Sequence, residues 1–211
     1  AFNAQLVRDP AFARTVGTIY TELPSNHQES IDRFLAQHTC EKELVIQMLR
    51  DFFELGWPCK PTLDFFVAVW EVNQSLPVDK KLRIRLVDMQ RPWEKIQKRE
   101  DWQAYDVNRD SFMAKNVLDD LGTKIDKRNG FFVVGMMHAM EELCFAEGTP
   151  RPSAGWHLKQ ALGDQLFTVF QHAPVMTDRG VTSGRLALGL IDSAFAKLDD
   201  RPMAFTLEDG P

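Results

Sequence analysis

The chain has 211 residues, of which 44% are hydrophobic and 26% charged, close to the composition of ordinary globular proteins. Its formal net charge of -5 and its lack of a long Lys/Arg run give no electrostatic reason to expect nucleic-acid binding. No stretch approaches the roughly 18 consecutive apolar residues of a membrane-spanning helix. We therefore expect a globular protein that buries roughly 70% of the surface its unfolded chain exposes.

The chain has three cysteines, Cys40, Cys59 and Cys144, and no CxxC pair. This odd number and spacing disfavour a disulfide framework or a structural zinc site and favour a reducing compartment, so we expect a cytoplasmic protein. The chain begins at Ala1 without a methionine, and we interpret it as a fragment or the ordered part of something longer. A signal peptide upstream of Ala1 is left open.

Strand and helix patterns alternate along the chain. Strands are expected where β-branched and aromatic residues gather or alternate with polar ones, and helices where apolar residues recur every three or four positions. In chain order, these rules predict a strand over 14–22, helices over 27–37, 41–55 and 62–74, a strand over 82–88, a loop with helical pieces over 91–105, a helix over 106–125, a strand over 131–135, a loop over 147–155, a helix over 156–162, a strand over 166–171, a helix over 186–198 and a strand over 203–207.

This alternation predicts an α/β fold: a parallel central sheet flanked by helices, with a helical insertion between the first two strands. The uninterrupted apolar run over 131–135 is typical of a fully buried parallel strand. No linker, repeat or low-complexity tract divides the chain, so we expect residues 1–211 to form a single α/β domain. The helix over 41–55 is apolar over a wide face, which fits either a monomer core or contact with a second copy in a homo-oligomer.

Sites in such sheets lie at the carboxyl ends of the strands. Glu22 closes the first predicted strand, Asp88 closes the second, and His138 follows the third by three positions. A carboxylate beside an imidazole can activate water or hold a metal ion, so Glu22 and His138 are candidate catalytic residues and, in a metal-dependent protein, candidate ligands. Structural interpretations stay open: a helix cap or ion pair for Glu22, and a satisfied core or capping histidine for His138.

Arg109 lies in the first turn of the helix predicted over 106–125, where the helix dipole disfavours a positive charge. A guanidinium there can clamp a carboxylate or phosphate or stabilise an oxyanion, so Arg109 is a third catalytic candidate. Asp88, Asp110 and His172 complete the set as candidate substrate contacts, although Asp110 also suits a helix start without any function. No GxSxG, P-loop, GxGxxG or HExxH motif suggests a different site.

Several short motifs spread from about Phe12 to Leu207 carry a family resemblance. They are Thr21-Glu22-Leu23 with Gln28 and Asp32-Arg33-Phe34, Phe65-Phe66 with Val72-Asn73 and Leu76-Pro77, the strand over 82–88, Asn108-Arg109-Asp110 with Met113-Ala114 and Asn116, and Val133-Val134-Gly135 with His138. Together they resemble the erythromycin esterase-like, ChaN-like and Tiki-like superfamily, most closely its uncharacterised bacterial members.

The resemblance implies a parallel α/β core with a polar pocket at the strand ends. In the esterase branch, a strand-end Glu, an Arg that opens a helix and a His after a later strand contribute to a water-activating site; these roles map onto Glu22, Arg109 and His138. The Tiki branch implies a metal-dependent protease, and the ChaN branch implies haem-iron binding. The family's first strand is followed by a Glu-x-His-Gly motif that nothing before Glu22 matches. This motif either lies upstream of Ala1, or has been lost, which leaves open a loss of the activity as well.

Three functions follow from these observations. The first is a hydrolase in which histidine activates water, with support from Glu22 and Arg109. The second is a protein that binds haem, a divalent metal or an anionic small molecule without catalysis, with His138 as a ligand. The third is a catalytically inactive interaction domain. The cofactor is left open between none, a divalent metal and haem, and the expected partner is a small-molecule substrate or ligand.

Overall fold

The computed structural model describes residues 2–51, 57, 59–105, 107–123, 126–146, 149–171, 175–177, 180–184 and 190–197. The chain divides into two compact units, Ala1–Thr168 and Val169–Pro211. In the second unit, an antiparallel pair, β6 (Val175–Thr177) with β7 (Gly180–Gly184), precedes the helix α9 (Leu190–Ala196). The expected single domain over 1–211 stays a prediction.

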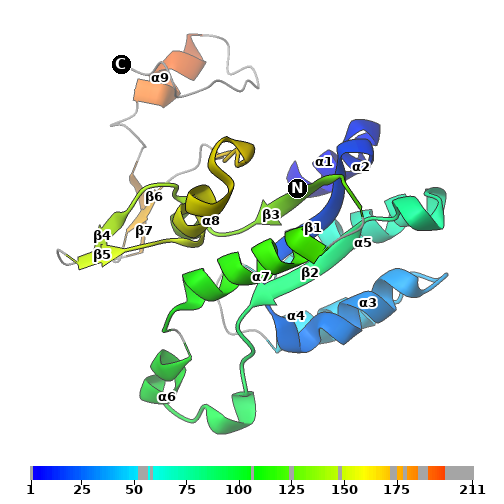
Figure 1. Ribbon diagram of the computed structural model, residues 1–211, viewed down its shortest axis with the longest axis horizontal. Coiled ribbons are helices and arrows are strands. Elements are labelled where there is room, and N and C mark those ends of the chain that lie inside the picture. The colour runs from blue at the N-terminus through cyan, green and yellow to red at the C-terminus, as the bar shows by residue number, and fades with distance from the viewer. Residues whose placement is uncertain are drawn as a thin grey trace. The chain divides into compact units, whose positions relative to one another are not determined.

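The first unit is built on a parallel sheet of three strands in the order β2–β1–β3 (Figure 1). The strands are β1 (Val16–Pro24), β2 (Arg83–Asp88) and β3 (Asn129–Val133). Ile19 of β1 lies opposite Ile84 on one side and Phe131 on the other. β1 is thus the central strand, and all of its residues are buried. The predicted α/β class, with a parallel sheet and helices inserted between its first two strands, is confirmed.

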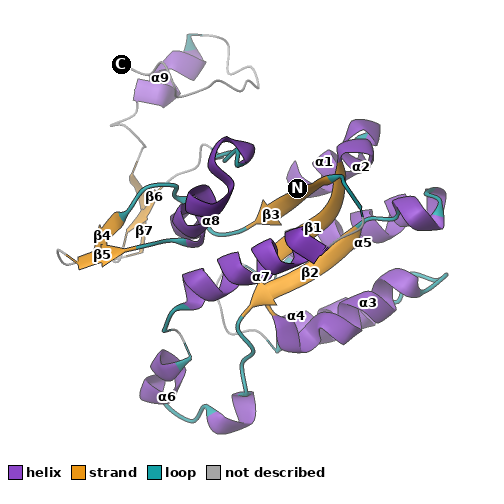
Figure 2. Ribbon diagram, viewed as in Figure 1, coloured by secondary structure: helices purple, strands orange, loops and turns teal. Residues whose placement is uncertain are grey.

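Helices pack on both faces of this sheet (Figure 2). Successive residues of β1 face opposite sides, as the pleat of a strand requires. Ile19 belongs to a core shared with α1 (Phe2–Arg8), α2 (Pro10–Thr15), α3 (Gln28–Ala36), α4 (Lys42–Arg50) and α5 (Lys60–Ser75). Tyr20 belongs to a second core shared with α7 (Arg109–Thr123) and α8 (Ala154–Leu162).

The remaining elements of this unit are short. They are the helix α6 (Arg99–Ala104), the antiparallel pair of β4 (Cys144–Ala146) and β5 (Thr149–Arg151), and the 3₁₀ turns η1 (Ser25–His27), η2 (Val78–Lys80), η3 (Trp93–Lys95), η4 (Met136–Ala139) and η5 (Gly163–Gln165). Within the described ranges, no helix has both the length and the apolar character needed to cross a bilayer.

Most predicted elements are present, with boundaries shifted by a few residues. The helix predicted from 156 begins at Ala154, because the Ser153 hydroxyl caps it by accepting a hydrogen bond from the Trp156 N–H (3.0 Å). The loop predicted over 147–155 includes β5, and the helices α1 and α2 were not predicted. The predicted strand over 203–207 and parts of the helices over 41–55 and 186–198 lie outside the described residues.

Two strand predictions need correction. The run over 131–135 was expected to be buried on both faces, but β3 is an outer strand whose residues are exposed or half-buried. The predicted strand over 166–171 has no regular structure, and Phe167, Val169 and Phe170 are exposed. An alternating pattern forms a strand only where a neighbouring strand supplies hydrogen bonds, and the pattern alone cannot show that neighbour.

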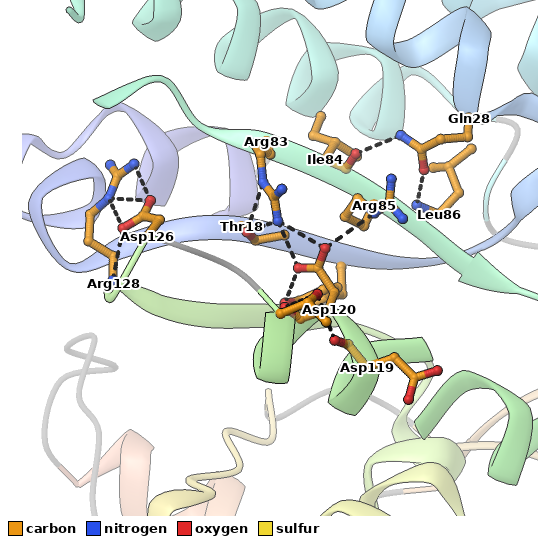
Figure 3. Close-up of polar contacts among 12 residues, drawn as sticks. Thr18, Gln28, Arg83, Ile84, Arg85, Leu86, Asp119, Asp120, Asp126 and Arg128 are labelled. Carbon is orange, nitrogen blue, oxygen red and sulfur yellow. Dashed lines mark hydrogen bonds and ion pairs between the residues drawn. The ribbon is translucent and has the colours of Figure 1, made fainter. Parts of the chain in front are cut away.

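Side-chain amides cover the outer edge of β2. Gln28 donates to the Ile84 carbonyl (2.9 Å) and accepts from the Leu86 N–H (2.9 Å), so its amide takes the place of a further strand (Figure 3). Asn73 does the same one step earlier, accepting from the Leu82 N–H (2.7 Å) and donating to the Leu82 carbonyl (2.9 Å). The exposed edge that would otherwise pair with another chain is thereby closed.

A polar cluster ties α7 to the sheet. Asp120 of α7 accepts hydrogen bonds from the Tyr20 hydroxyl (2.8 Å) and from Nη2 of Arg83 (2.8 Å), and Arg83 also donates to Thr18 Oγ1 (3.1 Å) (Figure 3). Burial raises the pKa of Tyr20, and the hydrogen bond to Asp120 raises it further. The cluster fixes α7 along β1 and β2, and it therefore also fixes the helix start that carries Arg109.

The Asn73 amide is predicted to matter for stability. The substitution Asn73→Ala leaves the buried N–H and the buried carbonyl of Leu82 without hydrogen-bond partners. This loss should lower the free energy of unfolding by about 2–4 kcal/mol. The matched control is Gln74→Ala, because the exposed Gln74 amide makes only a 3.3 Å hydrogen bond to the Trp70 carbonyl within its own helix. Urea unfolding of both variants measures the difference, and equal stabilities would contradict this role of Asn73.

Candidate functional site

Polar residues from several elements meet at the carboxyl ends of the strands. Glu22 lies near the end of β1, Asp88 ends β2, and His138 lies in η4 just beyond β3. Arg109 and Asp110 open α7. In the structure Glu22 contacts both Arg109 and His138, so the three predicted catalytic residues lie at one site, while their catalytic roles stay predictions.

Arg109 forms ion pairs with carboxylates from two neighbouring strands. Its Nε donates to both oxygens of Asp88 (3.0 and 2.9 Å), and its Nη2 donates to Glu22 Oε1 (2.7 Å) and lies 2.8 Å from Asp88 Oδ2. Charge-assisted bonds of this kind are the strong ones in proteins, and buried charges are tolerated only when they are paired. An ion-pair network therefore joins β1, β2 and α7 at the site.

The backbone conformation of Asn108 positions Arg109 at the start of α7. Its backbone has a φ of 63°, in the left-handed region that asparagine tolerates better than most residues. The Asn108 carbonyl accepts from the Phe112 N–H (3.0 Å), which starts the helix. The turn at Asn108 thus sets Arg109 and Asp110 in the first turn of α7, facing the strand ends.

The turn after β3 supplies a further bond to Glu22. The Gly135 N–H donates to Glu22 Oε2 (2.7 Å), so both carboxylate oxygens have partners. A Cβ at Gly135 would lie 3.2 Å from Glu22 Oε2 and 3.6 Å from Cδ2 of His138. Glycine at this position therefore avoids a tight contact between a Cβ and the Glu22 carboxylate, whereas the distance to the imidazole would be an ordinary van der Waals contact.

His138 lies between two carboxylates. Its Nδ1 is 2.7 Å from Asp110 Oδ1, and its Nε2 is 3.4 Å from Glu22 Oε1. Burial, the largest single influence, lowers the pKa of His138, but the hydrogen bond to Asp110 and the negative charges of Glu22 and Asp110 outweigh it. The net effect is a pKa above the ordinary value of histidine, in spite of the opposing charge of Arg109.

The start of α8 holds Asp110 in place. The Ala154 N–H donates to Asp110 Oδ1 (2.7 Å), the same oxygen that contacts His138. Gly155, the next residue, lets the start of α8 pack closely on η4, because a Cβ there would lie only 2.5 Å from the Ala139 carbonyl oxygen. Asp110 is thereby oriented from two sides, as expected for a carboxylate that fixes an imidazole ring.

Arg91 is a site residue that the sequence reasoning missed. Its side chain is fully buried, with Nη2 3.6 Å from Asp88 Oδ2 and Nη1 donating to the Tyr105 carbonyl (3.0 Å). Its guanidinium carbon lies 4.9 Å from the ring centroid of Trp102, within cation–π range, and Trp93 stacks on Trp102 at 5.4 Å. The available signal was an arginine three residues after a strand-end aspartate.

Two of the three predicted substrate contacts, Asp88 and Asp110, have partners within the protein. Asp88 binds Arg109, and Asp110 binds His138; His172 lies outside the described residues. No group of three or more His, Cys, Asp and Glu side chains in the described part of the chain could hold a metal ion. In the predicted pair of Glu22 and His138, Arg109 and Gly135 occupy the Glu22 oxygens, whereas Asp110 contacts only Nδ1 of the imidazole, so the metal-ligand role of the pair stays a prediction.

No family model matches this chain, and searches of curated proteins and of solved structures give no significant match. What the site can do chemically therefore follows from its own geometry. That geometry offers one group suited to proton transfer: an imidazole oriented by a carboxylate, with its second nitrogen turned toward another carboxylate.

The raised pKa of His138 predicts a proton-linked contribution to stability. Because the folded-state pKa lies above the unfolded value of about 6.5, the contribution is fully present below that pH and is lost as pH rises through the folded pKa. Titration by NMR should place the His138 midpoint above 6.5. Asp110→Asn, which keeps an oxygen for the Ala154 N–H, should lower the midpoint; an unchanged midpoint would show that Asp110 does not hold the proton on His138.

Proposed function

We propose that this chain is a hydrolase of neutral carbonyl compounds such as esters and lactones, with His138 as the base that activates water. The observation that carries the proposal is the contact between His138 Nδ1 and Asp110 at the strand ends of a parallel sheet. The family resemblance to the esterase branch agrees with this reading. Sites of parallel α/β sheets lie at the same edge.

The two nitrogens of the His138 imidazole have different roles in the proposed reaction. With the Nδ1 proton donated to Asp110, Nε2 carries the lone pair that accepts a proton from water. The hydroxide oxygen bonds to the carbonyl carbon, and the tetrahedral intermediate then expels the alcohol. The leaving oxygen takes its proton from Nε2, which returns His138 to its neutral form.

Glu22 and Arg109 support this cycle from the buried side. Glu22 Oε1, 3.4 Å from Nε2, stabilises the imidazolium that forms when His138 accepts a proton. Arg109 holds Glu22 in place through the 2.7 Å bond from Nη2. The oxyanion-stabilising role expected for Arg109 stays a prediction, because its Nε and Nη2 donate to carboxylates of the protein.

One alternative has an observation in its favour. The mutual pairing of Glu22, Arg109 and Asp88 is also what a non-catalytic domain needs to join its strands to α7. Binding of a metal through Glu22 has less support, since its oxygens already pair with Arg109 and the Gly135 N–H. Binding of haem iron through His138 stays a prediction. Measuring ester hydrolysis distinguishes the hydrolase from the non-catalytic domain.

His138→Gln tests the hydrolase. In a panel of nitrophenyl esters and lactones, kcat/KM should fall by about 10²- to 10⁴-fold, the usual contribution of a general base. His157→Gln is the matched control, because His157 lies in α8 against Trp156, and it should keep roughly wild-type turnover. Thermal unfolding checks that both variants fold. If the wild type hydrolyses these substrates and His138→Gln hydrolyses them equally well, His138 is not the base.

The pH dependence gives a second test of the same assignment. Only neutral His138 can accept a proton, so kcat/KM should rise with pH through a midpoint above 6.5. Asp110→Asn should move this midpoint to lower pH and reduce the plateau, because the imidazole loses its orienting carboxylate. A rate without a rising limb near neutral pH would exclude His138 as the base.

A further inference from the structure

Exposed apolar side chains stand next to His138 and Arg109 in the sequence. Met136 and Met137 directly precede His138 in η4 and are 45% and 62% exposed. Val107, two residues before Arg109, is 62% exposed. Exposed apolar side chains that cluster on a soluble protein mark contact sites more often than isolated ones do.

The distribution of these residues is not even over the first unit. Its large exposed apolar side chains, among the residues described, are Phe2, Val78, Val107, Met136, Met137, Leu143 and Phe167. Three of them stand within three residues of His138 or of the Arg109–Asp110 pair. We call Val107, Met136 and Met137 the apolar rim.

The exposed fractions of the side chains in the network show which of its ends is accessible to solvent. Side-chain exposure is 0% for Asp88, 7% for Glu22 and 12% for Arg109, but 24% for His138 and 26% for Asp110. The accessible end is therefore the end with the base, next to the methionines of η4.

We propose that the apolar rim binds the hydrophobic acyl part of a neutral ester substrate. The inference rests on the proposed hydrolase and adds its substrate class. Unbranched methionine side chains adapt to apolar groups of varied shape, which suits a surface that accepts an acyl chain.

Charge supports a neutral substrate. When His138 is neutral, as a base must be, the carboxylates of Glu22, Asp88 and Asp110 face the guanidiniums of Arg91 and Arg109 alone. The set then carries one excess negative charge, and an anionic substrate would be repelled.

The test compares nitrophenyl acetate, butyrate and octanoate. In the wild type, kcat/KM should rise with acyl length, by up to about fourfold for each methylene that is fully buried. The double variant Met136→Gln/Met137→Gln should lower the octanoate-to-acetate ratio of kcat/KM. Val78→Gln is the matched control: this side chain is 87% exposed in η2, which precedes β2 and so lies toward the amino end of the sheet, and the ratio should not change.

Calorimetric binding of N-methyloctanamide, a neutral amide with the octanoyl chain on its acyl side, gives a readout that does not depend on turnover. Weaker binding to the double variant than to the wild type supports the rim, even if no ester is hydrolysed and the hydrolase proposal falls. Ester hydrolysis that is independent of chain length overturns the rim and leaves the hydrolase standing. Equal binding of the amide to both proteins also overturns the rim.

Discussion

The arrangement of the whole site depends on one guanidinium between two carboxylates. Arg109 from α7 binds Glu22 from β1 and Asp88 from β2, and all three side chains are largely withdrawn from water. Removing one partner of such a buried pair costs roughly 3–5 kcal/mol, because the charge left behind has no solvent to stabilise it. The three elements are therefore constrained together, and the position of Arg109 decides that of Asp110, the next residue. Through Asp110, this constraint reaches His138.

Arg91 extends the same constraint into the connection between β2 and α7. Its guanidinium contacts Asp88, the Tyr105 carbonyl and the face of Trp102. A charged and tryptophan-bearing segment with little regular structure is thereby folded back toward the strand ends. The buried charge of Arg91 and the stacked rings of Trp93 and Trp102 depend on each other, since the rings shield the guanidinium that holds the segment.

The sequence predicted that Glu22 and His138 lie at the same edge of the sheet, because that prediction needs only strand boundaries and one geometric rule. Arg109 was found separately, from its place in the first turn of a helix. β1 and β2 carry clear residue patterns, so their carboxyl ends could be located to within about two residues. Arg91 could not be found in this way, because its partners Trp102 and Tyr105 lie in a segment without periodicity. The outer position of β3 and the irregular 166–171 segment were missed for a related reason: both depend on which neighbour a strand finds in three dimensions.

The charge balance of the site links its stability to its proposed chemistry. Protonated His138 brings the positive groups to three, together with Arg91 and Arg109, against the carboxylates of Glu22, Asp88 and Asp110. The folded protein is therefore most favourable with the proton on His138, whereas a general base must first lose it. The same carboxylates that raise the pKa of His138 make its neutral form a stronger base and reduce how much of that form is present near neutral pH. A site built in this way gains driving force for proton abstraction at the expense of the population of active base, and that compromise is what a histidine with a raised pKa imposes.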